Sequence, residues 1–381
     1  MEITYRKAQA EDISQIFQLY AHAYQGHYPD SLFYNVDEIQ ATISSEEKLI
    51  FVATNGGAKV VACILFLYDK FNRLSKAGGA IVLPSHRGHK ITENLIHFGI
   101  DYIKEKTSGM DVLYVTTRTV HKAAQILTQR IGFRQLGIFP NVHKTEEYET
   151  HALAALHFND CIKHRYTDFE QHPIVLPLYN IVRKNIDLPQ MKQAHMWQHK
   201  HYEGKIPTLE VVEAPQFIKR RSENLKEKNE IDLAFFPFKT PNLLITSPNQ
   251  IIEVFANVNH VDKHCVITGC KIDREISFTD LFLKVSSILR DRGIRYIEII
   301  IRANRLNIID KIAKAKFIPC GYIPAFQHEG GKRYDYVVFS RSFEILDFNN
   351  LELTGENELY LKYYINQWER TFLGSFFKND K

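Results

Sequence analysis

The chain lacks several features, and each absence excludes a class of protein. Its five cysteines are scattered and form no Cys-x-x-Cys pair, which argues against a disulfide framework or a zinc ribbon. The longest apolar run, VVACILFLY at residues 60–68, is far shorter than the roughly 20 residues that cross a bilayer. The amino terminus has no basic segment followed by an apolar one, as a secretory signal would have. We therefore expect a cytoplasmic protein that neither spans nor binds a membrane.

Charge of one sign and catalytic signatures are also scarce. The formal net charge is +4 over 381 residues, with 17 scattered histidines, and this balance gives no case for nucleic acid as a partner. There is no Gly-x-Ser-x-Gly elbow, no P-loop and no dinucleotide fingerprint, which disfavours hydrolases, NTPases and dehydrogenases. His195 and His199 have the spacing of paired metal ligands, but no glutamate lies between them and no carboxylate or cysteine completes a set. We predict no metal site.

Apolar residues, by contrast, are plentiful. They make up 45% of a chain that is longer than a single core usually supports, so two domains are expected. Apolar periodicity predicts the order strand, helix, three strands, helix, strand, helix and two strands. The predicted strands are residues 2–7, 48–54, 59–68, 77–83, 112–116, 133–139 and 148–156, and the predicted helices are residues 10–24, 87–106 and 121–131. A mixed, mostly antiparallel sheet flanked by helices, of α/β (α+β) class, buries this set.

A shift of 184 residues aligns the second half of the chain with the first. Without a gap, it places residues 111–141 on residues 295–325. Four positions then carry identical residues: Arg118 and Arg302, Phe133 and Phe317, Gly137 and Gly321, and Pro140 and Pro324. A period of this length is typical of a duplicated domain. The alternative is that two unrelated strand–helix–strand units share a common pattern.

This repeat divides the chain into two predicted domains of the same fold, a mainly helical connector and a helical tail. In chain order, these parts are residues 1–157 (first domain), 158–204 (connector), 205–345 (second domain) and 346–381 (tail). In the connector, LPLYNIVRKNI is suited to packing across a domain junction. In the tail, a predicted helix docks onto one of the domains through an apolar face. That face comprises Leu359, Tyr363, Ile365 and Trp368.

The stretch VLPSHRGHKITENL, residues 82–95, joins a predicted strand to a long predicted helix. Backbone N–H groups at the start of a helix are unpaired and lie at the positive end of the helix dipole, so they are suited to binding a diphosphate. Four basic side chains make the turn cationic: His86, Arg87, His89 and Lys90. The alternative is a solvated basic helix start with no ligand.

This segment resembles the cofactor loop of the GNAT superfamily of acyl-CoA N-acyltransferases. The family loop reads Arg/Gln-x-x-Gly-x-Gly/Ala after a strand that ends in Val-x-Pro. Its six positions are held here by Arg87, Gly88, His89, Lys90, Ile91 and Thr92. A second family pattern, Asn-x-x-Ala-x-x-x-Tyr followed by Gly-Phe, falls on His121, Ala124, Thr128, Gly132 and Phe133. Lys90 and Thr92 stand where the family has small residues, and Thr128 stands where it has a tyrosine proposed to protonate the departing thiolate.

The resemblance implies an acyl-CoA-dependent N-acyltransferase, in which the first domain holds acetyl-CoA or another acyl-CoA. Pantetheine would run beside Val82 and Leu83, and a backbone N–H near Leu83 would polarise the thioester carbonyl. The reaction expected is direct acetyl transfer to a small amine or amino-acid-like acceptor. In the second half, the segment KIDREISFTDLFLKVSS has no glycine, and Asp273 and Glu275 would repel phosphate. We therefore predict a second GNAT-like domain without a CoA site, which forms the far wall of the acceptor pocket.

Removing a proton from the acceptor amine requires a base, and the sequence offers three candidates. These are Tyr114, His121 and Glu298. Each has a structural alternative, because a tyrosine or histidine beside a core is more often a satisfied packing residue. The altered motif positions and the lack of an evident base support a different class of function. In that alternative, the protein is a catalytically inactive tandem module used for binding or scaffolding.

Overall fold

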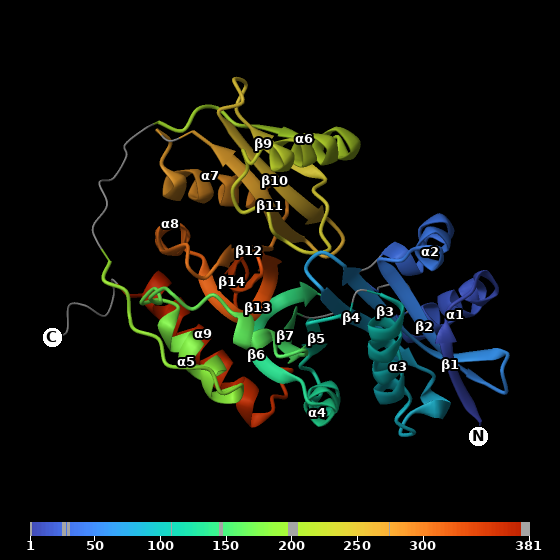
Figure 1. Ribbon diagram of the computed structural model, residues 1–381. Helices are drawn as coiled ribbons and strands as arrows, with labels where there is room; N and C mark the ends of the chain where they lie inside the picture. The colour runs from blue at the N-terminus through green and yellow to red at the C-terminus, as the bar shows by residue number, and fades with distance from the viewer. Residues whose placement is uncertain are drawn as a thin grey trace.

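The computed structural model of the protein describes residues 2–24, 28, 31–107, 109–144, 148–196, 205–273 and 275–374. Within these residues, fourteen strands form one continuous sheet in the order β1-β2-β3-β4-β5-β7-β6-β13-β14-β12-β11-β10-β9-β8. Read inward from either edge, the sheet has the same arrangement of seven strands. Figure 1 shows the two halves meeting at β6 and β13, near the centre of the molecule.

The first half contains every strand and helix that the sequence predicts, with ends that differ by a few residues. In chain order, its elements are β1 (Ile3–Lys7), α1 (Ile13–Tyr24), α2 (Val36–Ile43), β2 (Lys48–Asn55), β3 (Lys59–Asp69), β4 (Leu74–Val82), α3 (Ile91–Lys106), β5 (Val112–Arg118), α4 (Lys122–Ile131), β6 (Arg134–Lys144) and β7 (Tyr148–His157). The pairing is antiparallel except between β4 and β5. The expected mixed sheet with helices is confirmed.

The helices of this half form where apolar residues recur on one face. In α3, five apolar residues at helical spacing are buried: Ile91, Leu95, Ile96, Ile100 and Ile103. Helix α2 was not predicted, because eight residues give too few turns for a clear periodic signal. Its start is nevertheless encoded by Asn35, whose side chain accepts hydrogen bonds from the N–H groups of Asp37 and Glu38 at 3.0 and 3.2 Å.

The second half repeats the order of elements of the first, except for a counterpart of α2. Its elements are β8 (Glu210–Val212), α6 (Pro215–Glu227), β9 (Leu243–Thr246), β10 (Ile252–Asn259), β11 (His264–Ile272), α7 (Phe278–Asp291), β12 (Tyr296–Arg302), α8 (Leu306–Lys314), β13 (Ile318–Glu329) and β14 (Lys332–Ser342). This repetition agrees with the 184-residue shift. That the second half is a copy of the same kind of domain stays a prediction.

The two halves join at a pair of glycines. Gly137 on β6 lies opposite Gly321 on β13, and these are two of the residues that the sequence shift aligned. A Cβ atom at Gly137 would lie 2.4 Å from the carbonyl oxygen of Cys320 and 2.5 Å from the Cα of Gly321. Only glycine allows the two backbones to approach this closely. We call this contact between Gly137 on β6 and Gly321 on β13, together with the side chains around it, the seam.

Two helices outside the repeats cover the seam, α5 (Leu176–Asn185) and α9 (Gly355–Phe372). They lie side by side against β6 and β13 (Figure 1). The connector is less helical than predicted, because among its described residues only α5 and a short turn at Cys161–His164 are helical. The predicted face of α9 is wrong at Leu359, which is half exposed. The buried face of α9 instead centres on Tyr360, Tyr363 and Tyr364, and the first two donate hydroxyl protons to backbone carbonyls at 2.6 and 2.8 Å.

Candidate active site

Strands β4 and β5, which are neighbours within the first half of the sheet, diverge and leave a slot between them. Leu74–Ala77 pair with Val112–Val115, and beyond Ala77 the β5-facing edge of β4 has no partner strand within the described residues. The ladder with β3 is irregular at the same level, where Gly79 takes a φ of +63°. A bulge of this kind bends a strand and increases its twist. The slot therefore exposes backbone groups of β4 where two parallel strands would otherwise pair.

One of these backbone groups is a donor that points into the slot. Leu83 donates its own N–H to the carbonyl of Val61 at 2.9 Å, so Leu83 itself is not the oxyanion donor. Along an antiparallel strand, successive N–H groups point to opposite edges. The N–H of Val82 therefore points away from β3 and toward the slot. A role for this N–H group at a thioester carbonyl stays a prediction.

The turn between β4 and α3 uses left-handed backbone conformations. After a 3-10 turn at Pro84–His86, Gly88 has a φ of +83° and Lys90 has φ 56° and ψ 20°. Lys90 is the N-cap of α3 and lies outside the helix. A side chain in this left-handed region costs roughly 1–2 kcal/mol, which a glycine avoids. The glycine of the family pattern suits this backbone better than lysine does.

Lys90→Gly is accordingly expected to raise the free energy of unfolding by about 0.5–1 kcal/mol, since relief of backbone strain outweighs the entropy that glycine adds to the unfolded chain. Urea denaturation measures this change. Lys90→Ala is the matched control, because it removes the same charge and keeps the Cβ atom. Equal stability of the two variants would contradict the strain that we assign to Lys90.

The first turn of α3 is open to a ligand. Lys90 caps the helix without a side-chain hydrogen bond, and the first bond of the helix runs from the N–H of Asn94 to the carbonyl of Lys90 at 3.0 Å. The preceding N–H groups, including those of Ile91 and Thr92, therefore have no acceptor within the helix. Glu93 would repel an anion here, but it forms an ion pair with Arg130. The helix start thus presents free donors without an unpaired negative charge.

Of the four basic side chains in the turn, two are available to an anion. His86 is buried and contacts Ser85 and Asn55 at 2.9 and 3.3 Å, so it anchors the turn. The imidazole of His89 donates from Nδ1 to the carbonyl of Arg87 at 3.0 Å. Arg87 and Lys90 are exposed, and neither forms an ion pair within the part of the chain that the structure describes. These two supply the positive charge.

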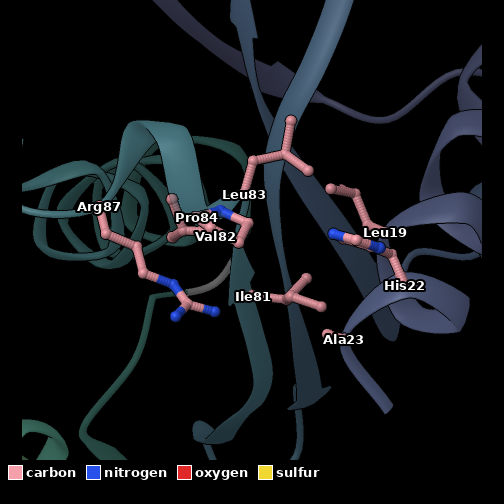
Figure 2. Close-up of a pocket in the computed structure, with 8 residues that line it drawn as sticks. All are labelled: Leu19, His22, Ala23, Ile81, Val82, Leu83, Pro84 and Arg87. Atoms are coloured by element: carbon pink, nitrogen blue, oxygen red, sulfur yellow. The ribbon is translucent and has the colours of Figure 1, made fainter. Parts of the chain in front are cut away.

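A pocket of about 160 Å³ adjoins the end of β4. It is lined by Leu19, His22, Ala23, Ile81, Val82, Leu83, Pro84 and Arg87. Figure 2 shows the α1 side chains on one side, Arg87 on the other and the end of β4 between them. Pockets that enclose a whole drug-sized ligand measure roughly 300–1,000 Å³. This pocket is therefore large enough for a narrow part of a ligand, whose charged end would lie at the surface near Arg87.

The structure brings two of the three predicted bases close together. Tyr114 on β5 is buried, and both burial and the nearby charge of Glu298 raise its pKa far above the ordinary value. On β12, Oε1 of Glu298 lies 3.0 Å from Nε2 of His264. Burial raises the pKa of Glu298, but nearby positive groups, His264 first among them, lower it below the ordinary value, so the carboxyl group stays ionised. His121 lies apart from them as the exposed N-cap of α4. A base role for any of the three stays a prediction.

Thr128 cannot replace the tyrosine of the family pattern. Its side chain is buried, and its hydroxyl donates to the carbonyls of Ala124 and Gln125, at 3.1 and 2.9 Å, inside α4. The hydroxyl is therefore turned into its own helix. A thiolate that leaves the slot would take its proton from another group or from water.

The seam holds a cluster of histidines and charged residues that the sequence analysis did not single out. The seam cluster comprises Arg118, His143, Glu149, His151, Asp262 and His264, from both halves. Nδ1 of His143 contacts a carboxylate oxygen of Asp262. The ring centroids of His143 and His151 are 4.6 Å apart, and those of His143 and His264 are 5.9 Å apart. No short motif could reveal this cluster, because more than one hundred residues separate some of its members.

The seam cluster reaches the slot through β5. Arg118, the last residue of β5, donates two hydrogen bonds to Glu149 on β7, at 2.6 and 2.5 Å. Tyr24, at the end of α1, lies close to Arg118. Burial raises the pKa of Tyr24, and the charge of Arg118 opposes this shift. Because α1 also lines the pocket, Tyr24 and Arg118 connect the pocket to the seam cluster.

The second half has a corresponding slot, but its own chain fills it. β11 pairs in parallel with β12 only over His264–Ile267, and then the strands diverge. Asp232, from the segment between α6 and β9, occupies the free edge of β11 through two backbone hydrogen bonds with Cys270, at 2.7 and 2.8 Å. The Ile231 side chain packs against Gly269, and a Cβ atom at Gly269 would lie 2.6 Å from Cδ1 of Ile231. A ligand could therefore not lie against this edge unless residues 231–232 left it.

The helix that follows this filled slot also lacks an open start. The hydroxyl of Ser277 caps α7 by accepting from the N–H of Asp280 at 3.4 Å, and Asp280 adds a negative charge to the first turn. The carbonyl of Asp273 accepts the N–H of Ile276 at 3.1 Å. The absence of a CoA site from the second half stays a prediction.

Two general features bear on metals and membranes. Among the described residues, no group of three or more histidine, cysteine, aspartate or glutamate side chains could hold a metal ion. His195 is exposed, and His199 lies outside the described residues. No described helix is long and apolar enough to cross a membrane.

Comparison with known proteins identifies the first half. Residues 13–133 match the model of the acetyltransferase (GNAT) family, a span that includes the slot, the cationic turn and α4. No curated protein matches the chain.

Several solved structures are similar to part of this chain. An N-acetyltransferase from Staphylococcus aureus Mu50 is 22% identical, with 41% of this chain and 99% of that chain covered and a TM-score of 0.36. YncA from Salmonella typhimurium, with its cofactor acetyl-CoA, is 19% identical (42% and 95% covered, TM-score 0.37). The ribosomal-protein-S18-alanine N-acetyltransferase from Escherichia coli is 18% identical (44% and 100% covered, TM-score 0.35). By the match of residues 13–133, the chain carries a domain of the GNAT acetyltransferase family in its first half.

Proposed function

We propose that the protein is an acyl-CoA-dependent N-acetyltransferase that transfers an acetyl group directly from acetyl-CoA to a small amine or amino-acid-like acceptor. One observation carries this proposal: the open start of α3 lies at the end of the slot between β4 and β5, with Arg87 and Lys90 unpaired beside it. A diphosphate needs this combination of free N–H groups and positive charge. The slot supplies a backbone edge for the amide-containing arm of the same ligand.

The residues of the first half then have separable roles. Arg87, Lys90 and the first N–H groups of α3 bind the diphosphate. Gly88 permits the left-handed turn that brings the backbone close to it. The N–H of Val82 donates to the thioester carbonyl and stabilises the negative charge that develops on its oxygen when the amine attacks. The acceptor approaches from the seam, so the second half forms its far wall.

Calorimetry with CoA and with acetyl-CoA tests this proposal. We expect one ligand per chain, because only the first half has an open slot and an uncapped helix start. Arg87→Ala should weaken binding about tenfold, since one charge-assisted hydrogen bond is worth roughly 1.5 kcal/mol. Arg220→Ala, which removes an exposed arginine from α6, is the control and should leave the affinity unchanged.

The possible outcomes separate the hypotheses. Absence of binding at millimolar CoA would refute the proposed function. Two sites per chain would show that residues 231–232 leave the second slot when CoA binds.

A binding or scaffolding role without catalysis is the second candidate, and the internal bonding of Thr128 favours it. Release of free CoA thiol from acetyl-CoA in the presence of amines distinguishes the two. A chain that binds CoA but releases no thiol with any amine is a binding module.

A further inference from the structure

His151 on β7 is a buried imidazole without a hydrogen-bond partner. Its side chain is 12% exposed, and neither ring nitrogen forms a hydrogen bond within the described residues. His157 lies on the same strand and provides a contrast, because its Nε2 donates to the carbonyl of Pro324 at 3.2 Å. Buried polar groups without a partner destabilise a fold, so they are rare and call for an explanation.

Three groups face the ring of His151. Glu149 is on the same strand, and its Oε2 is 3.8 Å from Nε2 of His151. Arg118 is directly opposite on β5, and the ring of His143 on β6 is 4.6 Å away. Burial lowers the pKa of His151 to about 4, with Glu149 opposing and His143 reinforcing this shift. The ring is therefore neutral near pH 7, with one nitrogen that accepts a hydrogen bond and one that donates.

These surroundings are complementary to an amine. Nε2 of His151 and Oε2 of Glu149 are close enough together for one ammonium group to donate to both. The carboxylate favours a cation, and a carboxylate oxygen can accept more than one hydrogen bond, so the contacts from Arg118 do not saturate it. The remaining ring nitrogen would meet an oxygen atom of the same molecule, as in an amino-acid-like or hydroxylated amine.

His151 lies on the strand next to the one that borders the slot. Its Cα is paired with that of Arg118, and β5 is the strand that borders the slot. The strand that carries His151 is thus one strand spacing, roughly 5 Å, from the strand that borders the slot. The guanidinium of Arg118 is 45% exposed and covers Glu149 on the solvent side. An acceptor would reach the ring by displacing this guanidinium.

We propose that His151, together with Glu149, binds the amino group of the acceptor in the seam. The acceptor is therefore a primary amine that is cationic in solution. This inference rests on the proposed acetyl transfer, and it assigns the acceptor position that the first half alone leaves open. His151 is then retained for binding, at the expense of stability.

A first experiment needs no acceptor. Because leucine fills the space of the ring and needs no hydrogen bond, His151→Leu is expected to raise the melting temperature by about 2 °C or more. His157→Leu is the matched control and should lower it, since it removes a bonded imidazole and leaves the carbonyl of Pro324 unpaired. A lower melting temperature for His151→Leu would overturn the proposal, because His151 would then support the fold.

A second experiment measures acetyl transfer as release of CoA thiol, with spermidine, glucosamine, L-alanine and L-lysine as acceptors. With any amine that reacts, His151→Leu should raise the KM for that amine at least tenfold, and His151→Asn, which can still accept a hydrogen bond, should raise it less. The affinity for CoA, measured by calorimetry, should stay within twofold. An unchanged KM for the amine would refute the role of His151 alone, whereas failure of the wild-type protein to bind CoA would refute the proposed function.

Discussion

Arg165→Ala is expected to lower the free energy of unfolding by about 3–5 kcal/mol. The Arg165 guanidinium and the Asp335 carboxylate are 1% and 0% exposed, and they form two hydrogen bonds, one of 2.8 Å from Nε. This pair ties the connector to β14. Removing the arginine leaves a buried carboxylate without its counter-charge, which is the most unfavourable outcome for a buried ion pair. Urea denaturation with the whole chain measures the change.

Two further variants show whether the unpaired charge is the cause. Arg165→Met combined with Asp335→Asn should recover more than half of the loss, because the amide oxygen still accepts from the N–H of Ala325 and the amide NH2 donates to the hydroxyl oxygen of Tyr322. Arg290→Ala should change stability by less than about 0.5 kcal/mol, since that arginine pairs with Asp291 on the exposed face of α7. An equal effect of Arg165→Ala and Arg290→Ala would show that the buried pair contributes no more than a surface pair.

Gly137→Ala is expected to lower the free energy of unfolding by about 1–3 kcal/mol, and more if the seam cannot widen. Its Cβ would collide with backbone atoms of Cys320 and Gly321, which are held in β13 and cannot turn aside as a side chain can. The same substitution should also disturb the seam cluster, because β6 carries His143. Thermal and urea denaturation give the stability, and calorimetry with CoA reports on the slot separately.

Gly321→Ala is the matched test of this reasoning. The nearest atom to a Cβ at Gly321 is a terminal methyl of Leu153 at 2.9 Å, and this side chain can shift. Gly321→Ala should therefore destabilise the protein less than Gly137→Ala. The reverse order would mean that the two backbones tolerate separation, and that side-chain packing around Leu153 limits the seam.

The seam places residues of the two halves next to each other. The slot and the cationic turn belong wholly to the first half, whereas Asp262, His264 and Glu298 of the second half lie at the seam, where the acceptor would bind in the proposed function. The second half has filled its own slot with residues 231–232, so its contribution is a surface that faces the first half. In this arrangement, one half would bind the cofactor and both would bind the acceptor.

Local sequence patterns were sufficient for the elements of the first half and for the cationic turn before α3. The apolar face of α3 was read from residues at helical spacing, and the cationic turn from four basic residues within five positions. Both depend on neighbours in the chain, so periodicity and turn chemistry report on them directly. Even there, the left-handed backbone of Lys90 was missed, because its cause is the path of the chain from β4 to α3.

The sequence by itself determined the order of elements, the equivalence of Gly137 and Gly321, and the placing of a cofactor loop before α3. Only the tertiary structure decided that the two glycines face each other, that Asp232 fills the second slot, and that His151 is left without a partner. The physical reason is that periodicity and capping act over a few residues, whereas pairing across the seam joins residues far apart in the chain. Such contacts depend on how the two sheets meet, and no local pattern records that.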